Sequence, residues 1–161
     1  MAFVLRALIL SAGLAGAAFA QDAKIAFGGL KQDTTLPVEV QADQLAVNNV
    51  DGSAVFTGNV LVGQGEMRLA AAEVKVKYGA DGQTIDQLIA SGGVTISNLA
   101  DAAEAREALY TIDSGIVVMT GDVLLTQGAS AIAGQKLTID LKAGTGVMEG
   151  RVSTTFVPGG N

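Results

Sequence analysis

The chain has 161 residues and contains no cysteine, no histidine and no tryptophan. Without cysteine, disulfides, thiol chemistry and soft-metal sites are excluded. Without histidine, the commonest general base and the commonest metal ligand are both missing. We therefore expect no metal centre and no cofactor.

Basic and aromatic residues are also scarce. Ten Lys and Arg residues face sixteen Asp and Glu residues, for a formal net charge of −6. This acidic balance argues against a nucleic-acid partner and against simple electrostatic adsorption to an anionic membrane. Aromatics make up 4% of the chain and hydrophobic residues 49%. The interior must then be built from Val, Leu, Ile, Ala and Met, which suit a narrow and continuous aliphatic interior.

What the chain does have is a repeat. Residues 52–65 and 115–128 are the same glycine-bounded unit at an offset of 63, and the match continues with Leu69 against Ile132 and Val76 against Ile139. A shorter Gly-X-Val element recurs at intervals of 29 to 34 residues, starting at Gly58, Gly92, Gly121 and Gly150. Intervals of about 30 residues fit two to three strands with their turns, which favours stacked hairpins or a solenoid-like sheet. For Gly92 and Gly150 alone, the tripeptide is equally typical of any β-protein.

The first 20 residues have the pattern of a signal peptide. Arg6 precedes an apolar run, and Ala18-Phe19-Ala20 is a small-X-small cleavage signal, so we expect export and cleavage after Ala20. A retained N-terminal anchor is the alternative. The run is too short for a comfortable membrane span. We predict a flexible lead over 21–36, one domain over 37–158 and a tail over 159–161.

Alternation of apolar and polar residues predicts strands over 38–43 and 54–62, and it is strict over 74–78 and 137–141. Gly58 and Gly121 lie midway along two such strands and predict a sharp bend or a close backbone approach. Residues 85–97 suggest a strand pair around Gly92-Gly93. The alanine-rich stretch 99–109 favours a helix by propensity, but the repeat aligns it with a strand. We therefore expect a loop or short helical turn at its start and a strand over 105–112.

Catalysis by paired carboxylates is the enzymatic possibility for an acidic β-repeat. The aspartates are scattered along the chain, and most lie beside glycine at turns, where they ordinarily bond the local backbone. They are Asp43, Asp51, Asp81, Asp86, Asp113, Asp122 and Asp140. We therefore expect no enzyme.

An aliphatic inward face permits two interpretations. It can bind acyl chains if the edges of the sheet do not close over it, or it can simply be a packed core. The residues by themselves leave both open.

Several segments resemble the OstA-like family of lipopolysaccharide-transport proteins. They are Val-Glu-Val-Gln-Ala-Asp-Gln-Leu (38–45), Phe-Thr-Gly-Asn-Val-Leu-Val-Gly-Gln-Gly (56–65), Val-Met-Thr-Gly-Asp-Val-Leu-Leu-Thr-Gln-Gly (118–128) and Val-Ser-Thr-Thr-Phe-Val-Pro (152–158). The likeness covers about residues 37–158 and is greatest to the small soluble periplasmic members, the LptA type. The alanine-rich stretch, the short tail and the acidity depart from the better-known members.

The resemblance implies an all-β fold, an open twisted β-jellyroll built from repeated antiparallel strands. It further implies a groove that holds the acyl chains of lipid A, and head-to-tail assembly into a bridge across the periplasm. The partners it implies are lipopolysaccharide, other copies of the chain, an inner-membrane anchored protein and an outer-membrane barrel protein of the same export pathway. We keep two alternatives: a self-assembling β-solenoid scaffold of the cell envelope without a ligand, and a polysaccharide-cleaving β-helix enzyme.

Strand parity selects the residues that would line the groove. They are Phe56, Val60, Val62, Val74, Val76, Ile96, Met119, Val123, Leu125, Leu137, Ile139 and Met148. The strands expected at the two assembly edges carry Val38, Val40 and Ala42 at one end and Val152, Thr154 and Phe156 at the other.

Overall fold

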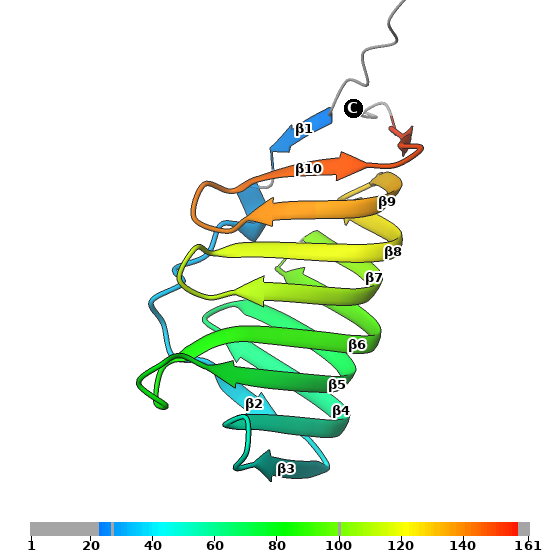
Figure 1. The fold of residues 1–161 in the computed structure, drawn as a ribbon. Helices are drawn as coiled ribbons and strands as arrows, with labels where there is room; N and C mark the ends of the chain where they lie inside the picture. Colours follow the sequence, from blue (N-terminus) through cyan, green and yellow to red (C-terminus); the bar gives the residue numbers. More distant parts are fainter. Residues whose placement is uncertain (1–22, 27, 100, 158–161) are drawn as a thin grey trace, which may run out of the picture.

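The computed structural model describes residues 23–26, 28–99 and 101–157, which form one long antiparallel sheet and a single turn of 3-10 helix (Figure 1). The expected signal peptide and the tail lie outside the described residues. The elements are β1 (Ala23–Ala26), η1 (Gly28–Leu30), β2 (Glu39–Gln41), β3 (Gln44–Asn48), β4 (Ser53–Gln64), β5 (Met67–Tyr78), β6 (Ile85–Asn98), β7 (Asp101–Thr111), β8 (Ile116–Gln127), β9 (Ser130–Asp140), β10 (Thr145–Glu149) and β11 (Ser153–Thr155). In the described part of the chain, no helix has the length and apolarity needed to cross a membrane.

The sheet is bent into two layers that share the same strands. Its order is β1-β10-β9-β8-β7-β6-β5-β4-β2, with β3 also on β4 and β11 also on β9. Each long strand, β4 to β9, has a register shift near its middle, where the chain passes from one layer into the other. We call layer A the layer that contains β1, β3 and β10, and layer B the layer that contains β2 and β11. Figure 1 shows the strands curving between the two layers along one side, and the hairpin turns gather on the opposite side. We call these sides the corner and the mouth. This arrangement confirms the all-β, open jellyroll predicted from the sequence.

The four Gly-X-Val elements make the corner. In each of them both the glycine and the following residue have positive φ, with the four glycines between +81° and +85°. Positive φ on two successive residues turns the strand sharply and adds one residue relative to its neighbour. In β4, for example, Thr57 and Val60 pair with Glu73 and Ala71, so two residues oppose the single Ala72. All four recurrences, including those at Gly92 and Gly150, are therefore the same structural device.

A second reason for glycine at the corner is space. A Cβ built on Gly92 would lie 2.6 Å from the Cβ of Ala72, and one on Gly150 would lie 2.7 Å from the Cβ of Gln135. A side chain of the neighbouring segment thus covers each corner glycine, at a distance that real Cβ atoms do not reach. The expectation of a bend with a close approach is confirmed in both respects.

The 63-residue repeat extends to the polar bonds at the corner. The amide of Asn59 donates to the Asp43 carboxylate at 2.9 Å, and the guanidinium of Arg106 donates to the Asp122 carboxylate. The two pairs occupy equivalent positions with donor and acceptor exchanged. Each pair joins a corner residue to the neighbouring segment. The two repeats therefore have an equivalent hydrogen bond, although the residues that form it differ.

Two expectations about strands were wrong, and the corner explains the first. Residues 85–97 are not a strand pair, because β6 runs without interruption from Ile85 to Asn98 and only bends at Gly92-Gly93. Among its described residues, the alanine-rich stretch has a turn only at Leu99, and the strand expected over 105–112 already begins at Asp101 as β7. Ladder bonds to both β6 and β8 outweigh the helix propensity of alanine there.

The lead segment also differs from a flexible lead. Residues 23–26 pair with β10, and Leu30 in the following 3-10 turn is fully buried. Little periodicity is visible in the lead because residues 28–36 form no strand and are held by separate hydrogen bonds.

We predict that Gly92→Ala destabilises the protein more than Gly93→Ala. Both glycines have φ near +80°, so both variants carry the left-handed backbone cost of about 1–2 kcal/mol. A Cβ on Gly93 meets nothing within 4 Å, whereas one on Gly92 collides with Ala72. The collision should add about 1–3 kcal/mol, measurable by equilibrium denaturant unfolding. Equal destabilisation of the two variants would contradict the close-packed corner.

Candidate functional site

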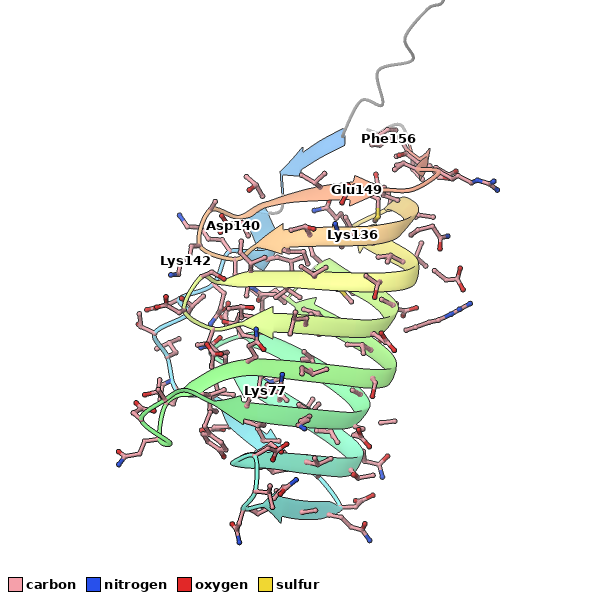
Figure 2. All side chains as sticks on the ribbon, in the orientation of Figure 1. Lys77, Lys136, Asp140, Lys142, Glu149 and Phe156 are labelled. Carbon is pink, nitrogen blue, oxygen red and sulfur yellow. The ribbon has the colours of Figure 1, made fainter. Side chains whose placement is uncertain are left out.

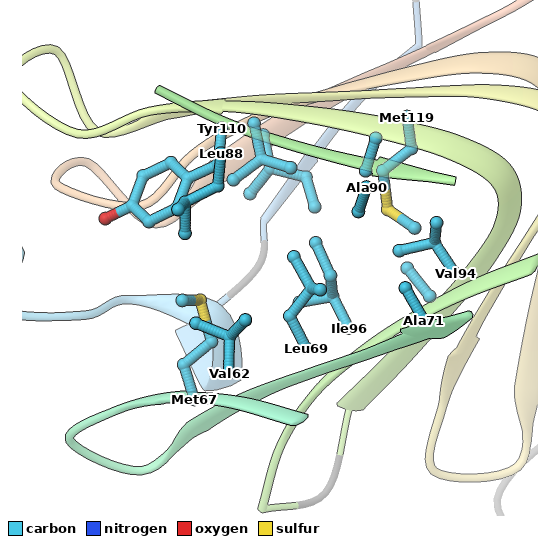
Figure 3. Close-up of a cluster of buried hydrophobic side chains, with 14 of the residues drawn as sticks. Val62, Met67, Leu69, Ala71, Leu88, Ala90, Val94, Ile96, Tyr110 and Met119 are labelled. Carbon is cyan, nitrogen blue, oxygen red and sulfur yellow. The ribbon is translucent and has the colours of Figure 1, made fainter. Parts of the chain in front are cut away.

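The space between the two layers is the candidate site. It is filled by one continuous cluster of buried side chains, nearly all aliphatic, contributed by every strand from β4 to β10. Figure 3 shows part of this cluster, with Leu88, Ala90 and Met119 facing Val62, Leu69 and Ile96 across the interior. Because aliphatic side chains offer no directional bonds, such a lining can accommodate an apolar partner of variable shape.

The structure places the predicted groove residues together. Eleven of the twelve are at most 1% exposed, and Phe56 is half-buried against the same cluster. They meet through the ladder: Val74 pairs with Phe56 on one side and Ala90 on the other, and Met119 pairs with Leu137. Parity alone was sufficient to find them, since successive residues of a strand point to opposite faces. Whether they contact a lipid remains a prediction.

The apolar inward face continues uncovered at the end of the molecule formed by β2 and β3. Leu45 and Val47 pair with Phe56 and Ala54, so they share the inward parity, yet they are 56% and 65% exposed. The predicted edge residues Val38, Val40 and Ala42 lie at this end too, half-buried against the core. The interior is therefore not capped at the β2/β3 end.

The opposite end carries the other predicted edge. Thr154 pairs with the buried Ile132 of β9, and Phe156, with the same parity, is 72% exposed (Figure 2). Sequence reasoning missed that β1 forms the edge of layer A here by pairing with β10. A salt bridge of 3.0 Å between Lys136 and Glu149 lies close to this edge.

The mouth is the polar margin of the interior. Gln64 is 1% exposed, and its side-chain oxygen accepts a 2.7 Å hydrogen bond from the Tyr110 hydroxyl, which joins layer B to layer A. Burial raises the pKa of Tyr110 to about 12, against the smaller opposing effect of this bond. The phenol is therefore neutral and donates throughout the physiological range.

Alternation of apolar and polar residues did not predict these residues at the mouth, because Gln64 is polar and Tyr110 is an isolated aromatic residue. The repeat offered one signal. Gln64 and Gln127 occupy equivalent positions, and Asn98 follows Gly92 at the same interval. All three amides end the strand halves of layer B at the mouth. Asn98 is 3% exposed, and its side-chain oxygen has no hydrogen-bond partner among the described residues.

A segment of the lead crosses the mouth. We call residues 28–36 the strap. Its Gln32 joins both layers, because the backbone nitrogen donates to the Leu141 carbonyl at 2.9 Å and the side chain donates to the Gln64 carbonyl at 2.7 Å. The Gln64 side chain donates in return to the carbonyls of Thr34 and Leu36, at 3.0 and 2.9 Å.

Several aspartate side chains accept hydrogen bonds from residues of their own turns. Asp51 and Asp81 accept bonds from hydroxyl and backbone donors of Ser53, Thr84 and Gln83, and these bonds lower the pKa of each aspartate to about 2. Asp140 likewise accepts from the backbone of its own turn. Asp51 and Asp81 therefore stay ionised at neutral pH and are poor proton donors. Among the described residues, no group of three acidic side chains could hold a metal ion.

A hollow outside the interior lies on the outer face of layer B. It has a volume of about 340 Å³ and is lined by residues such as Glu39, Leu61 and Arg68, near β2. Glu39 and Arg68 give its lining charged side chains, unlike the aliphatic interior.

Fold and site together define an open-ended β-jellyroll with an aliphatic interior and uncovered apolar ends. The family model described as LptA/(LptD N-terminal domain) LPS transport protein matches residues 39–145 of the chain. The chain therefore belongs to this family of lipopolysaccharide-transport proteins, as the OstA-like resemblance indicated.

Individual relatives agree with the family match. The chain is 28% identical over 156 residues to an uncharacterized protein of Rhizobium meliloti (strain 1021), covering 90% of this chain and 84% of that protein. It is 29% identical over 116 residues to the lipopolysaccharide export system protein LptA of Escherichia coli (strain K12), covering 68% of this chain and 63% of LptA.

A solved structure has the same fold. The crystal structure of LptH, the LptA-homologous periplasmic component of the lipopolysaccharide transport device of Pseudomonas aeruginosa, superposes with a TM-score of 0.70. The match covers 79% of this chain and 99% of LptH, at 19% identity.

Proposed function

We propose that this chain is a periplasmic carrier that holds the acyl chains of lipopolysaccharide between its two layers and stacks head to tail into a bridge between the membranes. The observation that supports this most is the aliphatic interior, which runs along a sheet whose two layers share a backbone ladder only through the strands that bend at the corner. Transfer of acyl chains into such a space is favourable by about 0.8 kcal/mol per buried CH₂ group. In this proposal the chain has no catalytic role.

The family supports the substrate class, since its members transport lipopolysaccharide. Export after cleavage at Ala20 and a periplasmic location fit the description of LptH as a periplasmic component. The inner-membrane anchored protein and the outer-membrane barrel protein of the pathway would then contact the two open ends. Acyl chains could pass between stacked molecules because apolar side chains are exposed at both ends, Leu45 and Val47 at one and Phe156 at the other.

The ligand-free scaffold remains the rival function, because one observation favours it. The interior residues are almost completely buried by one another, as a packed core would be. A carrier must therefore separate its layers to load, whereas a scaffold need not.

Site-specific photocrosslinking distinguishes the carrier from the scaffold. With p-benzoylphenylalanine in place of Val76, which points inward, we expect crosslinks to purified lipopolysaccharide. The same group in place of Lys77, the next residue and exposed on the outer face, should give none (Figure 2). Crosslinking is read on denaturing gels with antibody to lipopolysaccharide. Equal labelling at both positions, or labelling at Lys77 alone, would reject the groove.

Assembly has its own test. Edge strands that are not guarded by charge or proline favour pairing with another chain, and opposite edges favour open stacking. We expect concentration-dependent rods in analytical ultracentrifugation. Val47→Lys, which puts a charge on the inward face of β3, should shift the protein to monomers. Ala46→Lys, the adjacent exposed position of opposite parity, should still form rods. A wild type that stops at a dimer, or long species from Val47→Lys, would contradict the bridge.

A further inference from the structure

We infer that the strap, residues 28–36, is an internal occupant of the lipid groove that must leave the mouth before acyl chains can enter. This inference rests on the proposed function, and it adds the regulation of the same site. It assigns to the lead segment a role as a competitor of the ligand.

The first support is the position of Leu30. Its side chain is 0% exposed and belongs to the same buried cluster as Val62 and Met67, although η1 is not part of the sheet. A leucine side chain inserted between two layers of aliphatic residues fills space that a few methylenes of an acyl chain would otherwise fill. An acyl chain at this place and Leu30 therefore exclude each other.

The second support is the way the strap is held. Gln32 bonds to Leu141 at the end of β9 and to Gln64 at the end of β4, so one residue ties both layers at the mouth. Gln64 completes the link by bonding two strap carbonyls and the Tyr110 hydroxyl. While these bonds are in place, the layers cannot separate on the side where they are not joined by the corner.

The third support is that the strap can be released without breaking the sheet. Among the described residues, the strap forms no ladder with any strand, and it is attached by separate bonds and by one apolar side chain. Segments with few buried contacts open at a lower free energy than the strands of a core. Opening costs the Leu30 contacts, and an acyl chain in the vacated space recovers them.

Competition between the strap and lipopolysaccharide predicts a measurable change in binding affinity. If only a fraction of the molecules has the strap released, the apparent dissociation constant rises in inverse proportion to that fraction. Fixing the strap in place should therefore weaken binding of lipopolysaccharide, and loosening it should strengthen binding. If the strap were only structural, fixing it or loosening it would change the stability of the protein. It would not weaken binding in the first case and strengthen binding in the second.

Because the chain contains no cysteine, an engineered disulfide can fix the strap in place without a competing thiol. A Cβ on Gly29 would lie 3.5 Å from the Cβ of Asp101 at the start of β7, within the range of disulfides. Among the glycines with close neighbours, Gly29 also lacks the positive φ that would strain a substitution. The double variant Gly29→Cys/Asp101→Cys thus pins the strap to layer B, and its reduced form is the matched control.

The experiment measures binding of purified lipopolysaccharide to full-length wild type and to the double variant, oxidised and reduced, with circular dichroism to check folding. We expect oxidation to weaken binding at least about tenfold and reduction to restore it. Gln32→Ala should instead tighten binding by about threefold to tenfold, the worth of one ordinary hydrogen bond. Lys31→Ala, an exposed neighbour in the strap, should leave affinity unchanged.

The outcomes separate the two proposals. Equal binding by the oxidised and reduced forms, with wild type also binding, overturns the strap as a competitor and leaves the carrier function standing. Failure of the wild type and of every variant to bind overturns the carrier function, and the strap inference with it. Weaker binding by Gln32→Ala would also overturn the strap inference, because it would make the strap part of the binding surface.

Discussion

The corner of the sheet is the constraint on which the rest of the structure depends. At Gly58, Gly92, Gly121 and Gly150 the backbone takes two successive left-handed residues, and each glycine is covered by the neighbouring strand. The corner alone converts a long antiparallel sheet into two facing layers. Since it lies on one side, the other side is left with hairpin turns and no ladder between layers. Among the described residues, no backbone ladder therefore holds the two layers together at the mouth.

In the proposed function, the lipid-binding site and the hydrophobic core of this sheet occupy the same place. The side chains that would line a lipid groove bury one another when no acyl chain is between them, so loading exchanges one set of apolar contacts for another. This exchange keeps the free-energy cost of opening small. The mouth then decides access, and the polar residues Gln32, Gln64 and Tyr110 hold it shut in this structure.

Much of the fold could be predicted from the sequence, because both of its main signals are local. Alternation placed Val74 and Val76 on the inward face, and the repeated Gly-X-Val element marked each bend. The signal failed where tertiary contacts decide the outcome. Gly92-Gly93 is typical of a turn unless the neighbouring strands are known, and the alanine-rich residues 102–105 favour a helix by propensity although the ladder makes them strand. The strap was not predicted, because an irregular segment held by separate contacts has no periodic pattern of apolar residues. Only its hydrogen bonds to Gln64 and Leu141 in the structure reveal it.

The central claim is that the two layers separate at the mouth when lipopolysaccharide binds. Because the chain has no native cysteine, spin labels can be attached at introduced cysteines, and pulsed electron paramagnetic resonance then measures the distance between them. A pair at Gln83 in layer A and Glu66 in layer B, both exposed at mouth turns, spans the opening. A pair at Gln83 and Asp113, both in turns of layer A, does not. The account predicts that lipopolysaccharide lengthens the first distance and leaves the second unchanged. An unchanged first distance in the presence of bound lipid would contradict it.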